Sequence, residues 1–348
     1  MLIYSASRFA RIRKVLTLLV LGVLATASAA LGETRVGGKL RGEHEWTKEG
    51  NPYIVTRDII VAKGSTLRLG PGVTVRFKPN IVSSEGSNPF DLEILVKGTL
   101  IVEGAAKDTV LLTTDSESPT WRDWQGIVVQ GKEARAELKA VLITNCTEGV
   151  KCFQGTVVAD GVTINRNASY GMNFILGQGE LNDVFITQVG NSGGTGIGVN
   201  ITRDSEVTIR NSFIIGCQNG VAYGRKSAGS MENTMVASCA GRGVIIRNSS
   251  VDVMRCTISG NDYGLIVSAG SMPLVRENNI FQNNTADLSL SEYSGDPVRI
   301  DFSGNWWGGT HLGLIEERIL DAIDDPGRNA FAMIEPVLTE AMIHEPEE

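Results

Sequence analysis

The residues best suited to acid–base chemistry in this sequence are two aspartates and an arginine with a regular spacing. Asp160 and Asp183 lie 23 residues apart, and Arg210 follows them along the chain. Two carboxylates on neighbouring elements can act as acid and base in a hydrolysis, and carboxylates that hold calcium can act with an arginine that removes a proton. The competing interpretation, which we favour, is that these are solvated turn residues, because Asp is common in tight bends.

The spacing of these residues matters because they lie within a repeat. From Glu137 to Leu290 one pattern occurs about seven times: two alternating apolar residues, an Asn or Cys three residues later, and a Gly followed by an apolar residue. The glycine position recurs at 149, 171, 196, 220, 243, 264 and 287, where the last is Asp, so each step is 21–25 residues long. A period of about 20 to 30 residues indicates stacked units that cannot bury their apolar faces alone.

The elements that carry the repeat are predicted to be strands. Apolar residues alternate with a period of two, and three short strands separated by Gly and Asn turns fit in one copy. The pattern lacks the leucine ladder and helix-forming spacers of a leucine-rich repeat. The sequence therefore predicts an all-β fold, a parallel β-helix that forms a three-faced solenoid. Seven coils at a strand spacing of about 4.8 Å would give a rod of about 34 Å.

The Asn or Cys position of the repeat is expected to be structural. Its members are Cys146, Asn167, Cys217, Asn261 and Asn284. Stacked asparagines can hydrogen-bond to one another and tolerate left-handed backbone, and a cysteine fills the same volume as a small apolar residue. We therefore expect the five cysteines of the chain to be mostly free, buried thiols, with a Cys146–Cys152 bridge as the alternative.

Two other rows of side chains are predicted to point outward. The row after the repeat glycine contains no carboxylate; it consists of Lys151, Asn173, Gly198, Ala222, Ile245, Ile266 and Ser289. The middle strand of each copy gives a largely apolar row, namely Leu142, Thr163, Phe185, Phe213, Val236, Thr257 and Ile280. Phe185 and Phe213 could bind a ligand, since an exposed apolar stripe usually marks an interface. Coverage by residues 190–204 or by the C-terminal segment is the alternative.

The first 29 residues have the features of a secretory signal peptide. Four basic residues precede an apolar run from Val15 to about Ala25, and small residues follow at Ala27–Ala29. Its removal would leave 28 basic and 39 acidic residues, a net charge near −11. We therefore expect an exported protein, periplasmic or extracellular, with no membrane insertion of the mature chain. Its acidic surface argues against nucleic acid as a partner.

The segments on either side of the repeat carry a family resemblance. Residues 30–135 contain strands such as Val73–Phe77 and Leu92–Val96, and are expected to form a cap and the first, irregular coils. Residues 136–303 form the regular coils, and residues 304–348 close the helix with a short helix over Leu312–Ile323 and an acidic tail. The series Leu69-x-Pro71-Gly72-Val73, Trp124-x-Gly126-Ile127 and Gly304-Asn305-Trp306-Trp307-Gly308 resembles secreted bacterial right-handed parallel β-helix proteins, the pectate-lyase-like superfamily in its broad sense.

That resemblance implies a right-handed coil but not one activity, because such proteins include lyases, hydrolases, epimerases and adhesins. We expect a non-catalytic exported protein that binds a glycan or another cell-envelope component. The alternatives are a polysaccharide lyase or glycoside hydrolase that acts on an acidic polysaccharide through Asp160, Asp183 and Arg210, and a structural envelope module. The three histidines are scattered along the sequence and do not predict a metal site. We expect no cofactor other than, as an alternative, calcium. The chain is expected to be monomeric.

Overall fold

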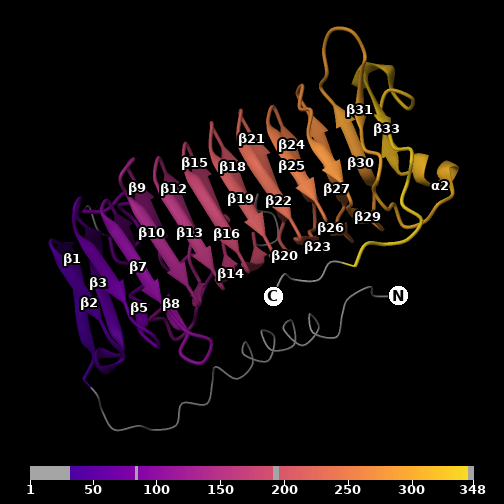
Figure 1. Ribbon diagram of the computed structural model, residues 1–348. Helices are drawn as coiled ribbons and strands as arrows, with labels where there is room; N and C mark the ends of the chain where they lie inside the picture. Colours follow the sequence, from indigo (N-terminus) through magenta and orange to yellow (C-terminus); the bar gives the residue numbers. More distant parts are fainter. Residues whose placement is uncertain (1–31, 83–84, 191–195, 344–348) are drawn as a thin grey trace.

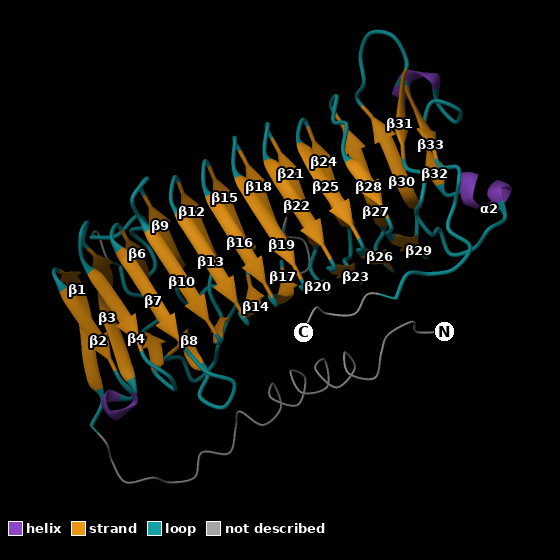
Figure 2. Cartoon of the chain, viewed as in Figure 1, coloured by secondary structure: helices purple, strands orange, loops and turns teal. Residues whose placement is uncertain are grey.

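The computed structural model describes residues 32–82, 85–190 and 196–343, and there the chain winds into a parallel β-helix (Figures 1 and 2). The predicted signal peptide and the last residues of the acidic tail lie outside the described part. Each coil contributes one strand to each of three faces. The rod begins at β1 and ends near α2, as Figure 1 shows.

The three faces follow one another in every coil. Face 1 is a ten-stranded parallel sheet made of β2 (Glu43–Trp46), β4 (Thr66–Leu69), β7 (Thr99–Glu103), β10 (Arg135–Lys139), β13 (Thr156–Asp160), β16 (Gln178–Asn182), β19 (Glu206–Arg210), β22 (Ala228–Glu232), β25 (Ser250–Met254) and β28 (Leu274–Arg276). Face 2 contains β5 (Thr74–Phe77), β8 (Val110–Thr114), β11 (Val141–Thr144), β14 (Thr163–Asn167), β17 (Phe185–Val189), β20 (Phe213–Ile215), β23 (Met235–Ala237), β26 (Thr257–Ser259) and β29 (Asn279–Phe281).

Face 3 contains β6 (Glu93–Val96), β9 (Gly126–Gln130), β12 (Glu148–Phe153), β15 (Tyr170–Ile175), β18 (Ile197–Thr202), β21 (Asn219–Gly224), β24 (Arg242–Arg247), β27 (Tyr263–Ser268), β30 (Ala286–Ser291) and β32 (Ile319–Leu320). Two long strands, β1 (Thr34–Leu40) and β3 (Tyr53–Val61), bend and contribute to both face 2 and face 3 in the first coils.

Strand pairing continues without a break from the N-terminal residues into the repeat. Strand β10 pairs in parallel with β7 before it and with β13 after it. The rod is therefore longer than the seven coils counted from the repeat, because residues 34–135 stack in the same register. At a spacing of about 4.8 Å, the ten strands of face 1 span about 43 Å.

Glycine recurs where successive coils touch. A Cβ built on Gly220 would lie 2.3 Å from Cγ1 of Val236 and 2.4 Å from the carbonyl oxygen of Gly243 in the next coil. The register pairs Tyr170 with Ile197, so the third member of this column, in β18, is Gly198 rather than the expected Gly196. The column ends at Asp287, whose backbone N–H donates to the carbonyl of Arg318 instead of to another repeat.

The predicted Asn or Cys position is a buried ladder, with a one-residue correction in two coils. Asn261 accepts from the backbone N–H of Cys239 (3.0 Å), and Asn283 accepts from the backbone N–H of Asn261 (3.1 Å). The ladder member in the last coil is therefore Asn283, not Asn284, which is exposed. In the middle copy Cys239 takes the place that the pattern gave to Ala240. All five cysteines are free and buried, so the alternative Cys146–Cys152 bridge is not formed.

The C-terminal end closes the rod with less helix than the sequence predicted. Helix α2 covers only Leu312–Glu316, because Ile319–Leu320 extends face 3 as β32 and pairs with β30. Strands β31 (Val298–Asp301) and β33 (Ala330–Met333) pair beside it, and Trp307 is buried. No helix in the described part of the chain is long and apolar enough to cross a membrane.

Candidate binding surface

On face 1 the two predicted aspartates lie on adjacent coils but one residue out of register. Asp160 pairs with Asn182, whose side-chain amide donates to the Asp160 carboxylate at 2.8 Å. Asp183 is the next residue and has a φ of 48°, in the turn that follows the strand. Arg210 is in register with Asn182, two coils from Asp160 and therefore about 10 Å along the rod. The register thus separates Asp160 from Arg210 by two coils and places Asp183 in a turn rather than on the strand.

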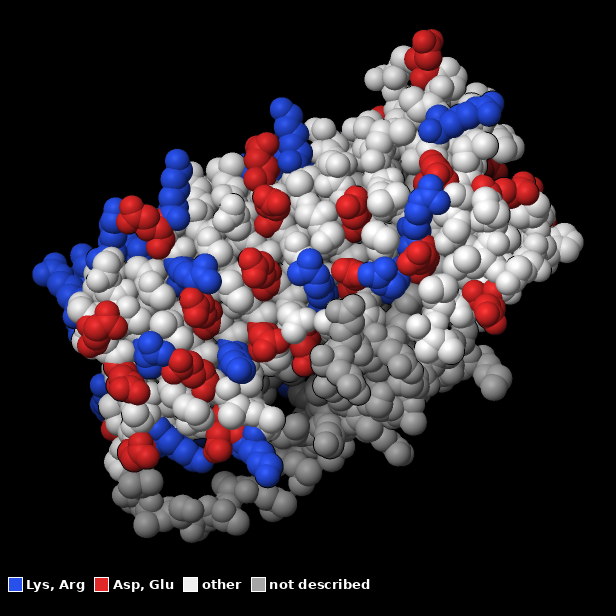
Figure 3. All heavy atoms as spheres, viewed as in Figure 1, with Lys and Arg blue, Asp and Glu red and all other residues white. Residues whose placement is uncertain are grey.

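The surroundings of these residues form a mosaic of opposite charges. The guanidinium of Arg210 lies 3.6 Å from the carboxylate of Glu232, and Arg255 pairs with Glu232 and with Glu277 (3.5 Å). Figure 3 shows Lys and Arg interspersed with Asp and Glu over the side of the rod that carries β7 to β25. Exposed pairs of this kind contribute little free energy, and they leave no concentrated field on face 1.

Face 2 carries the two predicted phenylalanines side by side. The rings of Phe185 and Phe213 have centroids 6.4 Å apart and a tilt of 46°; Phe213 is 8% exposed and Phe185 is partly exposed. The predicted stripe was wrong at Val236 and Ile280, which are fully buried in the core. The continuous register places Met235 and Asn279 in the row of Phe213 instead, one residue before each.

The C-terminal segment covers part of face 2, as one of the alternatives supposed. The side-chain amide of Asn279 donates to the carbonyl of Met342 (2.9 Å), and the backbone N–H of Met342 donates back to the Asn279 side chain (2.8 Å). Figure 1 shows this segment running back beneath the last coils. The stripe is therefore partly occupied by the chain itself near its C-terminal end.

Face 3 contains a row of polar side chains that are fixed by hydrogen bonds to one another. Glu148 and Asn173 are only 8% and 5% exposed, whereas Asn200 and Lys151 are partly exposed. The amide of Asn173 donates to the carboxylate of Glu148 (2.9 Å), and the amide of Asn200 donates to the side-chain oxygen of Asn173 (2.9 Å). The ammonium of Lys151 lies 3.4 Å from Glu148. These four residues, which we call the face-3 row, connect three adjacent coils.

Two aromatic side chains border the face-3 row. Tyr170 is in register with Glu148, and Phe153 is two residues beyond Lys151 on β12; both side chains are partly exposed. Burial and the negative charge of Glu148 raise the pKa of the Tyr170 hydroxyl, so the phenol stays protonated at neutral pH. The surface thus combines fixed amides, a carboxylate, a cation and two aromatic rings.

A buried carboxylate pair lies in the first coils, against the loop between β5 and β6. Asp58 and Glu93 are fully buried, and Asp58 accepts from the backbone N–H of Glu93 (3.1 Å). The Ser87 hydroxyl donates to Glu93 at 2.8 Å. Burial raises the pKa of the Glu93 carboxyl, and the neighbouring Asp58 charge adds to the shift, while the bonds from Ser87 and the charge of Lys151 oppose it.

Sequence reasoning missed these carboxylates. The outward row was counted from the residues after the repeat glycine, and in that row the structure replaces Gly198 by Asn200. Glu148 precedes its glycine by one residue, and Glu93 lies in a coil outside the recognised repeat. The glutamate beside Gly149 was the available signal. Among the described residues, no group of three or more His, Cys, Asp or Glu side chains could hold a metal ion.

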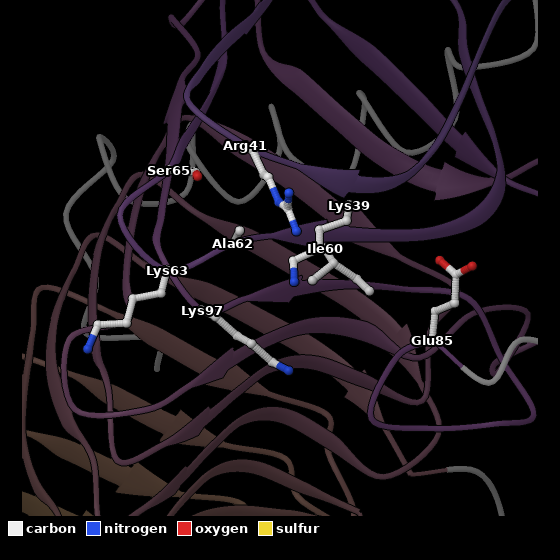
Figure 4. Close-up of a pocket in the computed structure, with 8 residues that line it drawn as sticks. All are labelled: Lys39, Arg41, Ile60, Ala62, Lys63, Ser65, Glu85 and Lys97. Atoms are coloured by element: carbon white, nitrogen blue, oxygen red, sulfur yellow. The ribbon is translucent and has the colours of Figure 1, made fainter.

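A cavity of about 530 Å³ lies at the amino-terminal end of face 3 (Figure 4). It is lined by side chains of β1, β3 and the turns that follow β1, β3 and β6, with Glu85 of the loop between β5 and β6 at one edge. Lys39, Arg41 and Lys97 are exposed there, whereas Ile60 and Ala62 are each only 8% exposed. The cavity is thus a basic rim over a small apolar floor.

Two family models match separate parts of this coil. Residues 41–163 match a pectate-lyase like beta helix domain, and residues 195–306 match a right handed beta helix region. Together with the strand order, these matches define the class: the chain is a right-handed parallel β-helix, and its first coils match the pectate-lyase like model. The fold class and the family resemblance predicted from the sequence are confirmed.

Individual relatives are distant. Protein bark beetle of Drosophila melanogaster is 33% identical over 76 residues, which are 22% of this chain, and the chain spans only 2% of that protein. The periplasmic alginate epimerase AlgG has the same fold over 88% of this chain and 74% of its own, with a TM-score of 0.57 at 13% identity. The A-module of the mannuronan C-5 epimerase AlgE6 of Azotobacter vinelandii aligns over 92% of this chain and 92% of its own, at 15% identity and with a TM-score of 0.37.

Proposed function

We propose that this protein is an exported, non-catalytic β-helix that binds a polysaccharide along face 3. The observation that carries the proposal is the face-3 row, in which Glu148, Asn173 and Asn200 are held by side-chain hydrogen bonds across adjacent coils. A ligand that meets fixed donors and acceptors loses less ordering free energy on binding. The row follows the rod axis, which suits a linear polymer that can contact one coil after another.

The neighbouring aromatic residues support a sugar ligand. A pyranose has an apolar ring face and a polar rim of hydroxyl groups, so it fits a surface on which Tyr170 and Phe153 lie beside amides and a carboxylate. The structural neighbour AlgG is named for alginate, which makes alginate a sensible first probe. Export is proposed from residues 1–29, and a monomer that uses no obligatory cofactor remains our expectation, with calcium as a variable in the assay.

The experiment is a binding titration of the purified chain against a panel of neutral and acidic polysaccharides, with and without calcium. Asn173→Ala should weaken binding at least about tenfold, because it removes the central member of the row and leaves Glu148 and Asn200 without their bonds to it. Asn182→Ala is the matched control, since Asn182 occupies a similar asparagine ladder on face 1. Equal affinity of both variants and the wild type for every polymer would overturn the proposal.

A second candidate is an enzyme that moves a proton on an acidic polysaccharide, and Tyr170 favours it. A protonated phenol beside Lys151 and Glu148 supplies an acid, a cation for a sugar carboxylate and a base within one patch. The face-1 set of Asp160, Asp183 and Arg210 is the other possible centre. New reducing ends, unsaturated products or solvent deuterium in the sugar would establish turnover. Loss of turnover in Tyr170→Phe or in Asp160→Ala would assign it to one face.

A further inference from the structure

We propose that the cavity at the amino-terminal end of face 3 binds an organic phosphate, at a site distinct from the face-3 row. The volume of about 530 Å³ lies within the range of small-molecule sites, roughly 300–1,000 Å³. Its floor belongs to the first coils, where Lys39 on β1 pairs with Ile60 on β3. The face-3 row begins further along the rod, at β12.

Three cationic groups converge on this cavity. In Figure 4 the nitrogen atoms of Lys39 and Arg41 lie close together, and the Lys97 side chain extends along the cavity below them. Within the described residues none of the three forms an ion pair. Lys63 also lines the cavity, but its ammonium turns away and pairs with Glu133 at 2.9 Å. Like charges gathered in a partly enclosed space repel one another, so an anion that enters it is stabilised.

The charge balance favours phosphate over a carboxylate. Among the described residues, Glu85 is the only acidic side chain that lines the cavity, so the three cations leave an excess of about two positive charges. A phosphate monoester carries about −1.5 to −2 charges and three strong acceptor oxygens, whereas a carboxylate carries one charge and two oxygens. Arg41 can hold two phosphate oxygens through its planar guanidinium, and the lysines act as mobile point charges.

The apolar floor indicates that the phosphate is attached to an organic group. Ile60 and Ala62 are nearly buried and offer carbon surface directly beneath the cationic rim. A free phosphate ion would gain nothing from that surface. A sugar or another small organic group on the phosphate would cover it and remove apolar area from water.

Calorimetric titration of the full chain at low salt tests this assignment, with glucose 1-phosphate, inorganic phosphate and galacturonate as probes. Glucose 1-phosphate should bind more tightly than inorganic phosphate, and at least about tenfold more tightly than galacturonate. Its affinity should fall between about pH 7.5 and pH 5.5, since the second phosphate pKa is about 6. Galacturonate, whose carboxylate stays ionised, should show no such change.

Variants at exposed positions localise the site. Arg41→Met and Lys97→Met should each weaken glucose 1-phosphate binding about tenfold or more, because each removes a charge-assisted hydrogen bond. Lys139→Met, which removes an exposed cation from face 1, is the matched control and should bind as the wild type does. Three results would each overturn the proposal. The first is no binding heat at about 10 mM glucose 1-phosphate, and the second is tighter binding of galacturonate or of inorganic phosphate than of glucose 1-phosphate. The third is equal affinity of the Arg41 and Lys139 variants for glucose 1-phosphate.

Discussion

Replacement of Asn283 by alanine should destabilise the last coils strongly. The Asn283 side chain is 2% exposed; its oxygen accepts from the backbone N–H of Asn261 (3.1 Å), and its amide donates to the carbonyl of Ile258 (3.2 Å). Alanine leaves both backbone groups buried without these bonds. At about 1–3 kcal/mol for each stranded group, the loss is about 2–6 kcal/mol of the free energy of unfolding. Asp287 keeps its bond from the Asn283 backbone N–H (3.0 Å) and is not stranded.

Urea denaturation, followed by the fluorescence of the tryptophans, measures this loss. With an m-value of about 3 kcal/mol/M, the urea midpoint should fall by about 0.7–2 M. Hydrogen exchange should locate the effect, with faster exchange of the Asn261 amide. Asn284→Ala is the control one residue away; its side chain is exposed, so the change should be within about 0.5 kcal/mol. Equal midpoints for the two variants, or a larger loss at Asn284, would refute the register of this ladder.

Three further predictions concern packing, thiols and pH. Gly220→Ala should lower the free energy of unfolding by about 1–3 kcal/mol, because its Cβ would lie 2.3 Å from Val236. Gly309→Ala is the control: a Cβ there has no neighbour within 4 Å, so the free energy of unfolding should change little. Thermal denaturation of the two variants compares them. Burial raises the pKa of Cys152 and of Cys256 to about 12, so a thiol reagent at mildly alkaline pH should react slowly with the folded chain. After denaturation the same reagent should modify five thiols. Rapid reaction of the folded chain, or fewer than five modified thiols, would contradict this prediction. Burial raises the pKa of Glu93 above its unfolded value, so the cost of its charge is present at neutral pH and disappears as the pH falls through the folded pKa. Glu93→Gln should therefore raise the melting temperature near pH 7.5 and by much less near pH 4, and a gain independent of pH would contradict the assigned cause.

Much of the fold could be predicted from the sequence because the coil is periodic. The recurring glycine marks the point at which one coil approaches the next, so a single column gives the period and the stacking. The predicted outward-facing residue of face 2 was wrong by one position in the copies that contain Val236 and Ile280. Met235-Val236-Ala237 is apolar throughout, and Asn279-Ile280-Phe281 is nearly so, so alternation cannot distinguish the two registers. A slip of one residue turns every side chain to the opposite face.

The binding surface was harder to predict than the fold. Its residues come from different coils and become neighbours only when the register is known, as with Glu148 and Asn173, which are 25 residues apart. The cavity cations come from the first coils, which lie outside the recognised repeat and are bent at β1 and β3. Asp160 and Asp183 had the expected period, but period alone does not state which side of a strand or turn a carboxylate occupies.

The most direct test of the face-3 proposal is covalent footprinting of the chain with and without the polysaccharide that it retains best. Each face carries a partly exposed, reactive side chain: Tyr170 and Phe153 on face 3, Phe185 on face 2 and Met254 on face 1. We predict that the polymer protects Tyr170 and Phe153 and leaves Phe185 and Met254 unchanged. Protection of Phe185 or Met254 without protection of Tyr170 would contradict the account and move the binding surface to another face.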